Sequence, residues 1–143
     1  MGRDDLGFLL AKAAQRWNEL LAERFVAAGF EEVRPSYGSV LLPLFEEDGL
    51  RMGDLARRGR LSKQTMTELV RRLERSGLVE RRADPDDGRA SQIFLTDRSR
   101  ELEPVAAEVL RDLDRLVRHR LDPARVGELK AALRTLAELG DGE

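Results

Sequence analysis

The 143-residue sequence contains no cysteine, one histidine and one tryptophan. The absence of cysteine excludes disulfides, thiolate zinc sites and cysteine-based redox sensing. No apolar run approaches the roughly 20 residues that a membrane-spanning helix requires. The first residues, Met-Gly-Arg-Asp-Asp, do not form a signal peptide. We therefore expect a cytoplasmic protein.

The sequence also lacks the patterns that carry most enzyme chemistry. It has no glycine-rich phosphate-binding loop, no pair of histidines at metal-ligand spacing and no serine in a nucleophile turn. His119, the single histidine, lies late in a charged segment, where a solvated or interface position is expected. The acidic run 46–48 is interpreted as a solvated turn, with a cation site as the alternative. We predict no enzymatic activity, no metal and no cofactor.

Charged residues are plentiful, but they are unevenly distributed. They make up 36% of the chain, hydrophobic residues make up 41%, and the net charge is −2. These values suit a single domain, or one domain with a dimerisation extension, built from long helices around a core. Residues 51–82 hold ten basic and four acidic residues, so the rest of the chain carries a net charge of −8. This distribution predicts a positive field on one face only, as a DNA-binding module requires.

Residues 62–76 are predicted to form an amphipathic helix. Ser62 occupies the N-cap position and Gly77 follows the last turn, where a left-handed residue is favoured. The apolar residues recur at steps of three and four and form one buried stripe: Met66, Leu69, Val70 and Leu73. The opposite face carries Lys63, Gln64, Thr67, Glu68, Arg71, Arg72 and Arg75. Such a face is either an ordinary solvated surface or one that enters a DNA major groove, which admits a single helix.

A hairpin is predicted directly after this helix. Val79–Arg82 and Ser91–Leu95 have strand character, and the sequence between them contains the turn cluster Asp-Pro-Asp-Asp-Gly-Arg. Arg89 is expected near the tip, where an arginine can enter a narrow minor groove. Asp87 is expected to brace that arginine or the base of the turn. In isolation, a surface hairpin with solvated charges would explain this segment equally well.

The order of these elements is more specific than any one of them. A short helix containing Leu55 and Ala56, a turn, a second helix and a hairpin form a winged helix-turn-helix. The sequence resembles the MarR family of transcriptional regulators through Gly-Asp-Leu-Ala-Arg-Arg, Leu-Ser-Lys-Gln-Thr-Met-Thr-Glu-Leu-Val-Arg-Arg-Leu-Glu, Gly-Leu-Val-Glu-Arg and Asp-Pro-Asp-Asp-Gly-Arg-Ala. It departs from the usual pattern at Gly59 and Arg60, since a glycine often stands at the second of these positions. We expect a reshaped turn with Arg60 directed outward toward a phosphate.

The resemblance implies a set of DNA contacts from the second helix and the wing. Ser62, Gln64, Thr65, Thr67 and Arg71 would read the major groove. Lys63 and Arg72 would hold phosphates, and Asp87 and Arg89 would act at the wing, with the arginine in the minor groove.

The remaining segments are predicted to be mainly helical. One helix is expected from about Asp4 to Ala28 and a second from Pro35 to Phe45, where Pro43 predicts a kink or an early end. Leu50 and Arg51 are expected to add a short strand beside the wing. A long helix should follow Thr96, from about Asp97 to Arg120, and Asp122-Pro123 is a strong start signal for the last helix. The predicted fold is mostly α with a small β-hairpin wing. Its parts are an N-terminal dimerisation helix (1–34), the winged module (35–96) and the long and C-terminal dimerisation helices (97–143).

The first and last helices carry apolar stripes longer than a small winged module can cover. Stripes of this size usually mark an interface, and in the family resembled here the terminal helices pair across a two-fold axis. The predicted dimer contacts are Leu6, Leu9, Leu10, Ala13, Leu129, Leu133 and Leu136. The alternative is that both stripes pack within one chain against the long helix. A homodimer would place two recognition helices about one DNA turn apart, so its operator would be a pseudo-palindrome.

The resemblance implies a sequence-specific DNA-binding regulator, most often a repressor, that a small aromatic ligand releases from DNA. The candidate pocket residues are Trp17, Tyr37 and Val40, all of which serve equally well as core residues. The alternative function is a winged-helix module that binds protein without reading DNA. Strongly salt-sensitive binding to DNA would distinguish the two.

Overall fold

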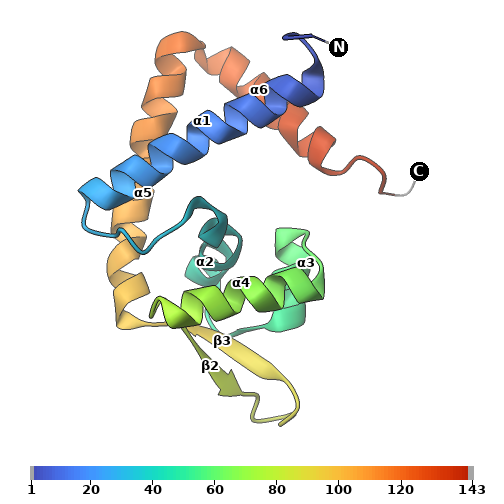
Figure 1. The fold of residues 1–143 in the computed structure, drawn as a ribbon. Coiled ribbons are helices and arrows are strands. Elements are labelled where there is room, and N and C mark those ends of the chain that lie inside the picture. Colours follow the sequence, from blue (N-terminus) through green and yellow to red (C-terminus); the bar gives the residue numbers. More distant parts are fainter. Residues whose placement is uncertain (1, 142–143) are drawn as a thin grey trace.

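In the computed structural model, which describes residues 2–141, a winged module lies at one end of the molecule and long helices lie at the other (Figure 1). The winged module holds a 3₁₀ turn η1 (Pro35–Tyr37), α2 (Gly38–Glu46), β1 (Leu50–Arg51), α3 (Met52–Gly59), α4 (Lys63–Arg75), β2 (Val79–Ala83) and β3 (Ser91–Leu95). The long helices are α1 (Leu6–Ala27), α5 (Asp97–Arg120) and α6 (Pro123–Ala137). The predicted fold class is therefore confirmed. Within the described residues, no helix is both long and apolar enough to cross a membrane.

The strands form one antiparallel sheet in the order β1-β3-β2. Leu50 pairs with Ile93, and Val79 pairs with Leu95, so the apolar side chains of all three strands meet on the core side. The short strand predicted at Leu50–Arg51 is confirmed. It follows Gly49, whose φ of +72° suits glycine, and a Cβ at this position would lie 2.8 Å from the Phe94 ring. A larger residue at position 49 would therefore displace the edge of the sheet.

Three helices, α4, α5 and α6, begin with the caps that the sequence predicts. Ser62 accepts a hydrogen bond from the Thr65 amide at 3.1 Å, and Asp122 accepts one from the Arg125 amide at 2.9 Å. Thr96 and Ser99 exchange side-chain and backbone hydrogen bonds in a capping box at the start of α5. These local bonds explain why the bounds of α4, α5 and α6 fall within a residue or so of the predicted ones.

The core of the winged module lies between α4, α2, α3 and the sheet. Its fully buried side chains include Leu44, Leu55, Met66, Leu73, Leu78 and Ile93. All four residues of the predicted α4 stripe are buried, so the opposite face of the helix is left for solvent or a partner. The core continues along α5 through Leu102 and Leu113 to Leu21 and Phe25 of α1.

Residues 35–46 differ from the single helix that the sequence predicts. The segment begins as the 3₁₀ turn η1, and α2 then continues through Pro43 to Glu46. Of the two outcomes expected at Pro43, a kink or an early end, the early end does not occur. Packing of the buried residues Val40, Leu41 and Leu44 stabilises the helix despite the backbone hydrogen bond that Pro43 cannot make.

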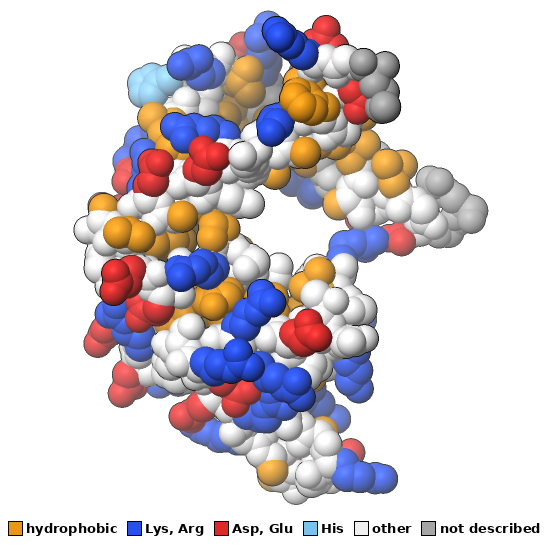
Figure 2. Space-filling model, viewed as in Figure 1, with side chains coloured by type: hydrophobic (Ala, Val, Ile, Leu, Met, Phe, Trp, Pro, Cys, Tyr) orange, Lys and Arg blue, Asp and Glu red, His pale blue; other side chains and the backbone are white. Residues whose placement is uncertain are grey.

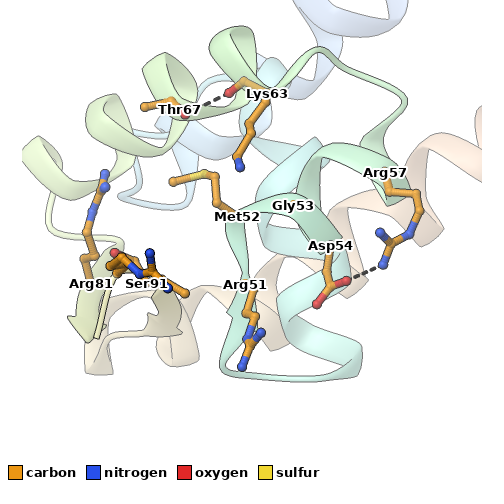
Figure 3. A pocket seen from close by; sticks show the side chains of 11 residues that line it. Arg51, Met52, Gly53, Asp54, Arg57, Lys63, Thr67, Arg81 and Ser91 are labelled. Atoms are coloured by element: carbon orange, nitrogen blue, oxygen red, sulfur yellow. Dashed lines mark hydrogen bonds and ion pairs between the residues drawn. The ribbon is translucent and has the colours of Figure 1, made fainter. Parts of the chain in front are cut away.

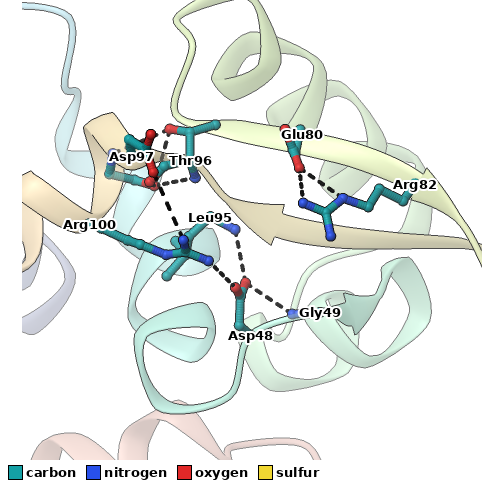
Figure 4. A network of polar contacts seen from close by, with 9 residues as sticks. Asp48, Gly49, Glu80, Arg82, Leu95, Thr96, Asp97 and Arg100 are labelled. Atoms are coloured by element: carbon teal, nitrogen blue, oxygen red, sulfur yellow. Dashed lines mark hydrogen bonds and ion pairs between the residues drawn. The ribbon is translucent and has the colours of Figure 1, made fainter.

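Two charged residues join the winged module to the long helices. Asp48 accepts hydrogen bonds from the Gly49 and Leu95 amides, at 3.0 and 2.8 Å, and pairs with Arg100 of α5 at 3.2 Å (Figure 4). Arg98 of α5 stacks on Phe30 and donates hydrogen bonds to Glu32, and its guanidinium lowers the pKa of that carboxyl. The first turn of α5 is therefore bonded to the segments on either side of α2.

The turn between α3 and α4 contains the departure noted at Gly59 and Arg60. Arg60 adopts the left-handed conformation, with φ 53° and ψ 41°, which costs a non-glycine residue roughly 1–2 kcal/mol. A Cβ at Gly59 would lie 3.2 Å from the Met66 side chain, so the small residue allows α3 and α4 to approach. The Arg60 guanidinium pairs with Asp141 after α6. Arg60 is therefore directed outward, as expected, and its partner in the free protein is a carboxylate; a contact with a phosphate stays a prediction.

Candidate nucleic-acid interface

The outer face of α4 presents polar and basic side chains next to the wing. Lys63, Gln64, Thr65, Arg71 and Arg72 are exposed, and Ser62 is exposed at the N-cap. Thr67 is half-buried, and its hydroxyl donates a hydrogen bond to the Lys63 carbonyl at 2.8 Å.

These side chains differ in how free their polar groups are. The Ser62 hydroxyl is engaged with both the amide and the hydroxyl of Thr65, at 3.1 and 2.8 Å. Lys63, Gln64, Arg71 and Arg72 have no such intrahelical side-chain partner among the described residues. These four side chains can therefore donate hydrogen bonds to a ligand, whereas a new bond from Ser62 would compete with its role as the helix cap.

Arg89, near the end of the wing, contacts Asp87 through its backbone amide and, at longer range, through its side chain. The Arg89 side chain is 96% exposed, while its amide donates to Asp87 Oδ1 at 3.1 Å. The same carboxylate lies 3.6 Å from Arg89 Nε, and the Asp87 carbonyl accepts from the Ala90 amide at 2.9 Å. Asp87 thus shapes the turn while the Arg89 guanidinium projects into solvent.

Asp84 anchors the base of the wing, a role that the sequence interpretation missed. Its carboxylate is 3% exposed, accepts a hydrogen bond from the Asp86 amide at 2.8 Å and pairs with Arg51 Nη2 at 2.5 Å. The Asp86 amide, followed by the charge of Arg51, lowers the pKa of Asp84 below its ordinary value and keeps it ionised. An aspartate before proline at a strand end indicates a turn. The pairing of Asp84 with Arg51 could not be predicted in this way, because Arg51 lies 33 positions earlier in the chain.

Basic side chains gather over α4 and the wing (Figure 2). Between them lies a cavity of about 380 Å³, lined by Arg51, Met52, Gly53, Asp54, Arg57, Lys63, Thr67, Arg81, Arg89, Ala90 and Ser91. This lining brings Lys63, Thr67 and Arg89, which were predicted as contacts, to one place. It also adds Arg51, Arg57 and Arg81, which the sequence interpretation counted as charge but did not assign to the site.

Trp17 lies at a second cavity, of about 300 Å³, between α1, α2 and α5. Its other lining residues include Leu21, Phe25, Arg34, Leu42, Phe45 and Leu110. Tyr37 and Val40, predicted to line the same pocket, are instead 6% and 0% exposed and belong to the core. Residues three apart share one face of a helical segment, and the face that holds Tyr37 and Val40 packs into the core.

The predicted dimer residues remain largely uncovered in the single chain. Leu6, Leu9 and Leu10 of α1 are 60%, 47% and 39% exposed, and Leu129 and Leu133 of α6 are 42% and 43% exposed. Ala13 is exposed and Leu136 is half-buried. The alternative in which both stripes pack internally against α5 is therefore not what the chain adopts.

Comparisons with known proteins agree with this architecture. The MarR family model matches residues 35–91. The HTH-type transcriptional regulator TtmR of Methylorubrum extorquens is 40% identical over 109 residues, covering 71% of this chain and 54% of the relative, so the chain spans about half that protein's length. The PcaV regulator from Streptomyces coelicolor, solved with its natural ligand, has a TM-score of 0.80 at 26% identity, covering 97% of this chain and 99% of that one.

A DNA-bound structure shares the fold equally well. The transcriptional repressor CouR, solved on a 23-mer DNA duplex, has a TM-score of 0.80 at 27% identity and covers 96% of each chain. Its agreement extends over the winged module and the long helices alike. The family model, the sequence relative and the shared fold agree, and the chain therefore belongs to the MarR family of transcriptional regulators.

Proposed function

We propose that this protein is a sequence-specific DNA-binding regulator that acts as a homodimeric repressor on a pseudo-palindromic operator. The observation that carries the proposal is the exposed polar face of α4 beside a wing that ends in a fully solvated arginine. Residues 51–82, which include this face, hold an excess of six positive charges on an otherwise acidic chain. The similarity to a repressor solved on DNA supports the same conclusion.

The proposed contacts divide between base readout and backbone positioning. Ser62, Gln64, Thr65, Thr67 and Arg71 lie along the face of α4 that would enter the major groove. Lys63 and Arg72 flank this face and would hold phosphates. Arg89 would enter the minor groove, and Asp87 would hold the turn in shape.

The proposed dimer uses the two uncovered stripes of α1 and α6. An exposed apolar surface of this extent is unusual for a monomer, and it lies at the end of the molecule opposite the wing (Figure 1). Residues 1–34 and 97–143 would then serve dimerisation, and 35–96 would bind DNA. Repression by such a dimer requires no further chemistry, since occupancy of the operator is sufficient.

We propose that a small aromatic acid binds the cavity beside Trp17 and changes the spacing of the two recognition helices. The cavity is mainly apolar in its lining, has Arg34 at its edge and lies between the dimerisation helix α1 and helix α2 of the winged module. A ligand there would shift the equilibrium only by its difference in affinity between the two spacings.

Trp17 supplies the readout for this ligand. Phenolic and benzoic acids are expected to change the Trp17 fluorescence and to weaken operator binding at the same concentrations, because Trp17 is the single tryptophan and lines the cavity. Substitution of Leu42, on the same cavity, by phenylalanine should reduce its free volume and weaken both effects, while Trp17 remains the single tryptophan. If neither fluorescence nor DNA affinity responds to any acid of a broad panel, the cavity is part of the core only.

Replacing Arg89 by alanine is expected to weaken operator binding by about 10-fold or more, since one charged minor-groove contact is removed from each wing at about 1–3 kcal/mol. Fluorescence anisotropy on the DNA upstream of its own gene, at two salt concentrations and beside unrelated DNA, measures this effect. Arg115→Ala, which removes a 65% exposed arginine from α5, is the matched control. If the wild-type protein binds no DNA even at low salt, the proposal is wrong and a protein-binding module takes its place.

A further inference from the structure

The cavity between α4 and the wing is lined by cations from separate elements. Lys63 lines it from α4, Arg51 from β1 and Arg81 from β2 (Figure 3). The lining contains five basic residues and one acidic residue, Asp54. A cavity with this balance is suited to an anion.

Two of the arginines are held in position by carboxylates. Asp84, at 3% exposure, pairs with Arg51 at 2.5 Å, and Glu74 of α4 pairs with Arg81 at 2.9 Å. A guanidinium carries five N–H donors, so each arginine keeps donors for a second partner. Within the described part of the chain, the Lys63 ammonium has no carboxylate partner.

The geometry of duplex DNA determines what this cavity meets. The major and minor grooves are separated by a sugar–phosphate backbone, so a protein with one element in each groove must straddle that strand. Here the two elements are α4 and the wing tip, and the cavity lies between them. The volume of about 380 Å³ exceeds that of about ten water molecules, which leaves room for a phosphate with part of its hydration.

We propose that this cavity holds a backbone phosphate of the strand between the two grooves, contacted by Arg51 and Arg81 in addition to Lys63. The proposal rests on the DNA-binding function proposed above and adds two contacts to it. Asp84 acts as a positioning residue. Its carboxylate holds Arg51 at the cavity and also fixes the conformation of the wing turn. The simpler reading is that both arginines serve only to attach the wing to the module.

The dependence of affinity on salt separates these readings. Each lost phosphate contact reduces the slope of log affinity against log salt by about 1, so one substitution in the proposed dimer reduces it by about 2 and weakens binding to all sequences alike. Arg51→Gln and Arg81→Gln are each expected to do this on both operator and unrelated DNA. Between 50 and 200 mM salt, the affinity of each variant dimer should then fall about 16-fold less than that of the wild type.

Charge-retaining variants and a distant control make the test decisive. Arg51→Lys and Arg81→Lys should restore most of the slope, and Arg115→Gln on α5 should leave it unchanged. Amide hydrogen exchange of residues 84–90 reports whether the wing is still ordered in Arg51→Gln. A weaker affinity with the wild-type slope would show a role in wing attachment alone and overturn the phosphate site. Wild-type protein without salt-dependent DNA binding would instead overturn the proposed function itself.

Discussion

Replacing Leu133 by aspartate is expected to convert the protein to a monomer and to weaken operator binding by about 100-fold or more. Leu133 lies on the exposed stripe of α6, 43% exposed in the single chain. In the proposed dimer a carboxylate at this position would be buried without a partner in two symmetry-related places. A monomer can hold only one half-site, and it loses the gain of about 10²–10⁴ that linking two binding modules provides.

The same substitution should leave the fold of each chain intact, because the Leu133 side chain is not part of the core. Thr135→Asp introduces the same charge two residues later on a different face of α6 and should remain dimeric. Light scattering after size-exclusion chromatography measures the assembly, and anisotropy on the full operator and on one half-site measures the binding. A dimeric Leu133→Asp protein with normal operator affinity would place the interface elsewhere.

Replacing Leu73 by alanine is expected to lower the free energy of unfolding by about 3 kcal/mol, within the range measured for buried leucines. Leu73 has no exposed surface and lies on the inner face of α4 against the core of the winged module. Alanine forms helices as readily as leucine does, so the loss comes from transfer and from the cavity left behind. The thermal midpoint should fall by about 6–12 °C for a domain of this size.

Urea unfolding followed by circular dichroism measures this loss, at equal protein concentrations because dimerisation contributes to stability. Glu68→Ala is the matched control on the exposed side of the same helix and should change the free energy by less than about 0.5 kcal/mol. A loss below about 1 kcal/mol for Leu73→Ala would mean that α4 repacks around the gap.

Much of the winged module was predictable because its signals are local. The Ser62 cap, the stripe from Met66 to Leu73 and the Gly77 stop lie within one stretch of sixteen residues, and each acts on the backbone beside it. The hairpin follows from its turn cluster in the same way. The order of these elements then identified the family before any contact between them was known.

The candidate site was predictable only in part. The exposed positions of Lys63, Gln64, Arg72 and Arg89 were predictable because helix periodicity and turn position determine which side chains face outward. Tyr37 and Val40, predicted to line the ligand cavity, lie in the core instead, because the helix face that they share packs inward. Tertiary packing, as much as the local sequence, determines which side chains of a short helical segment face inward.

The sequence by itself determined the elements, their caps, the exposed polar face of α4 and the uneven charge, because each depends on neighbours along the chain. Only the tertiary structure decided the pairings between distant residues: Asp84 with Arg51, Arg98 with Glu32, and Arg60 with Asp141. The chain contains 25 basic and 27 acidic residues, so very many ion pairs are possible. Selection among them follows from which surfaces the hydrophobic core brings together.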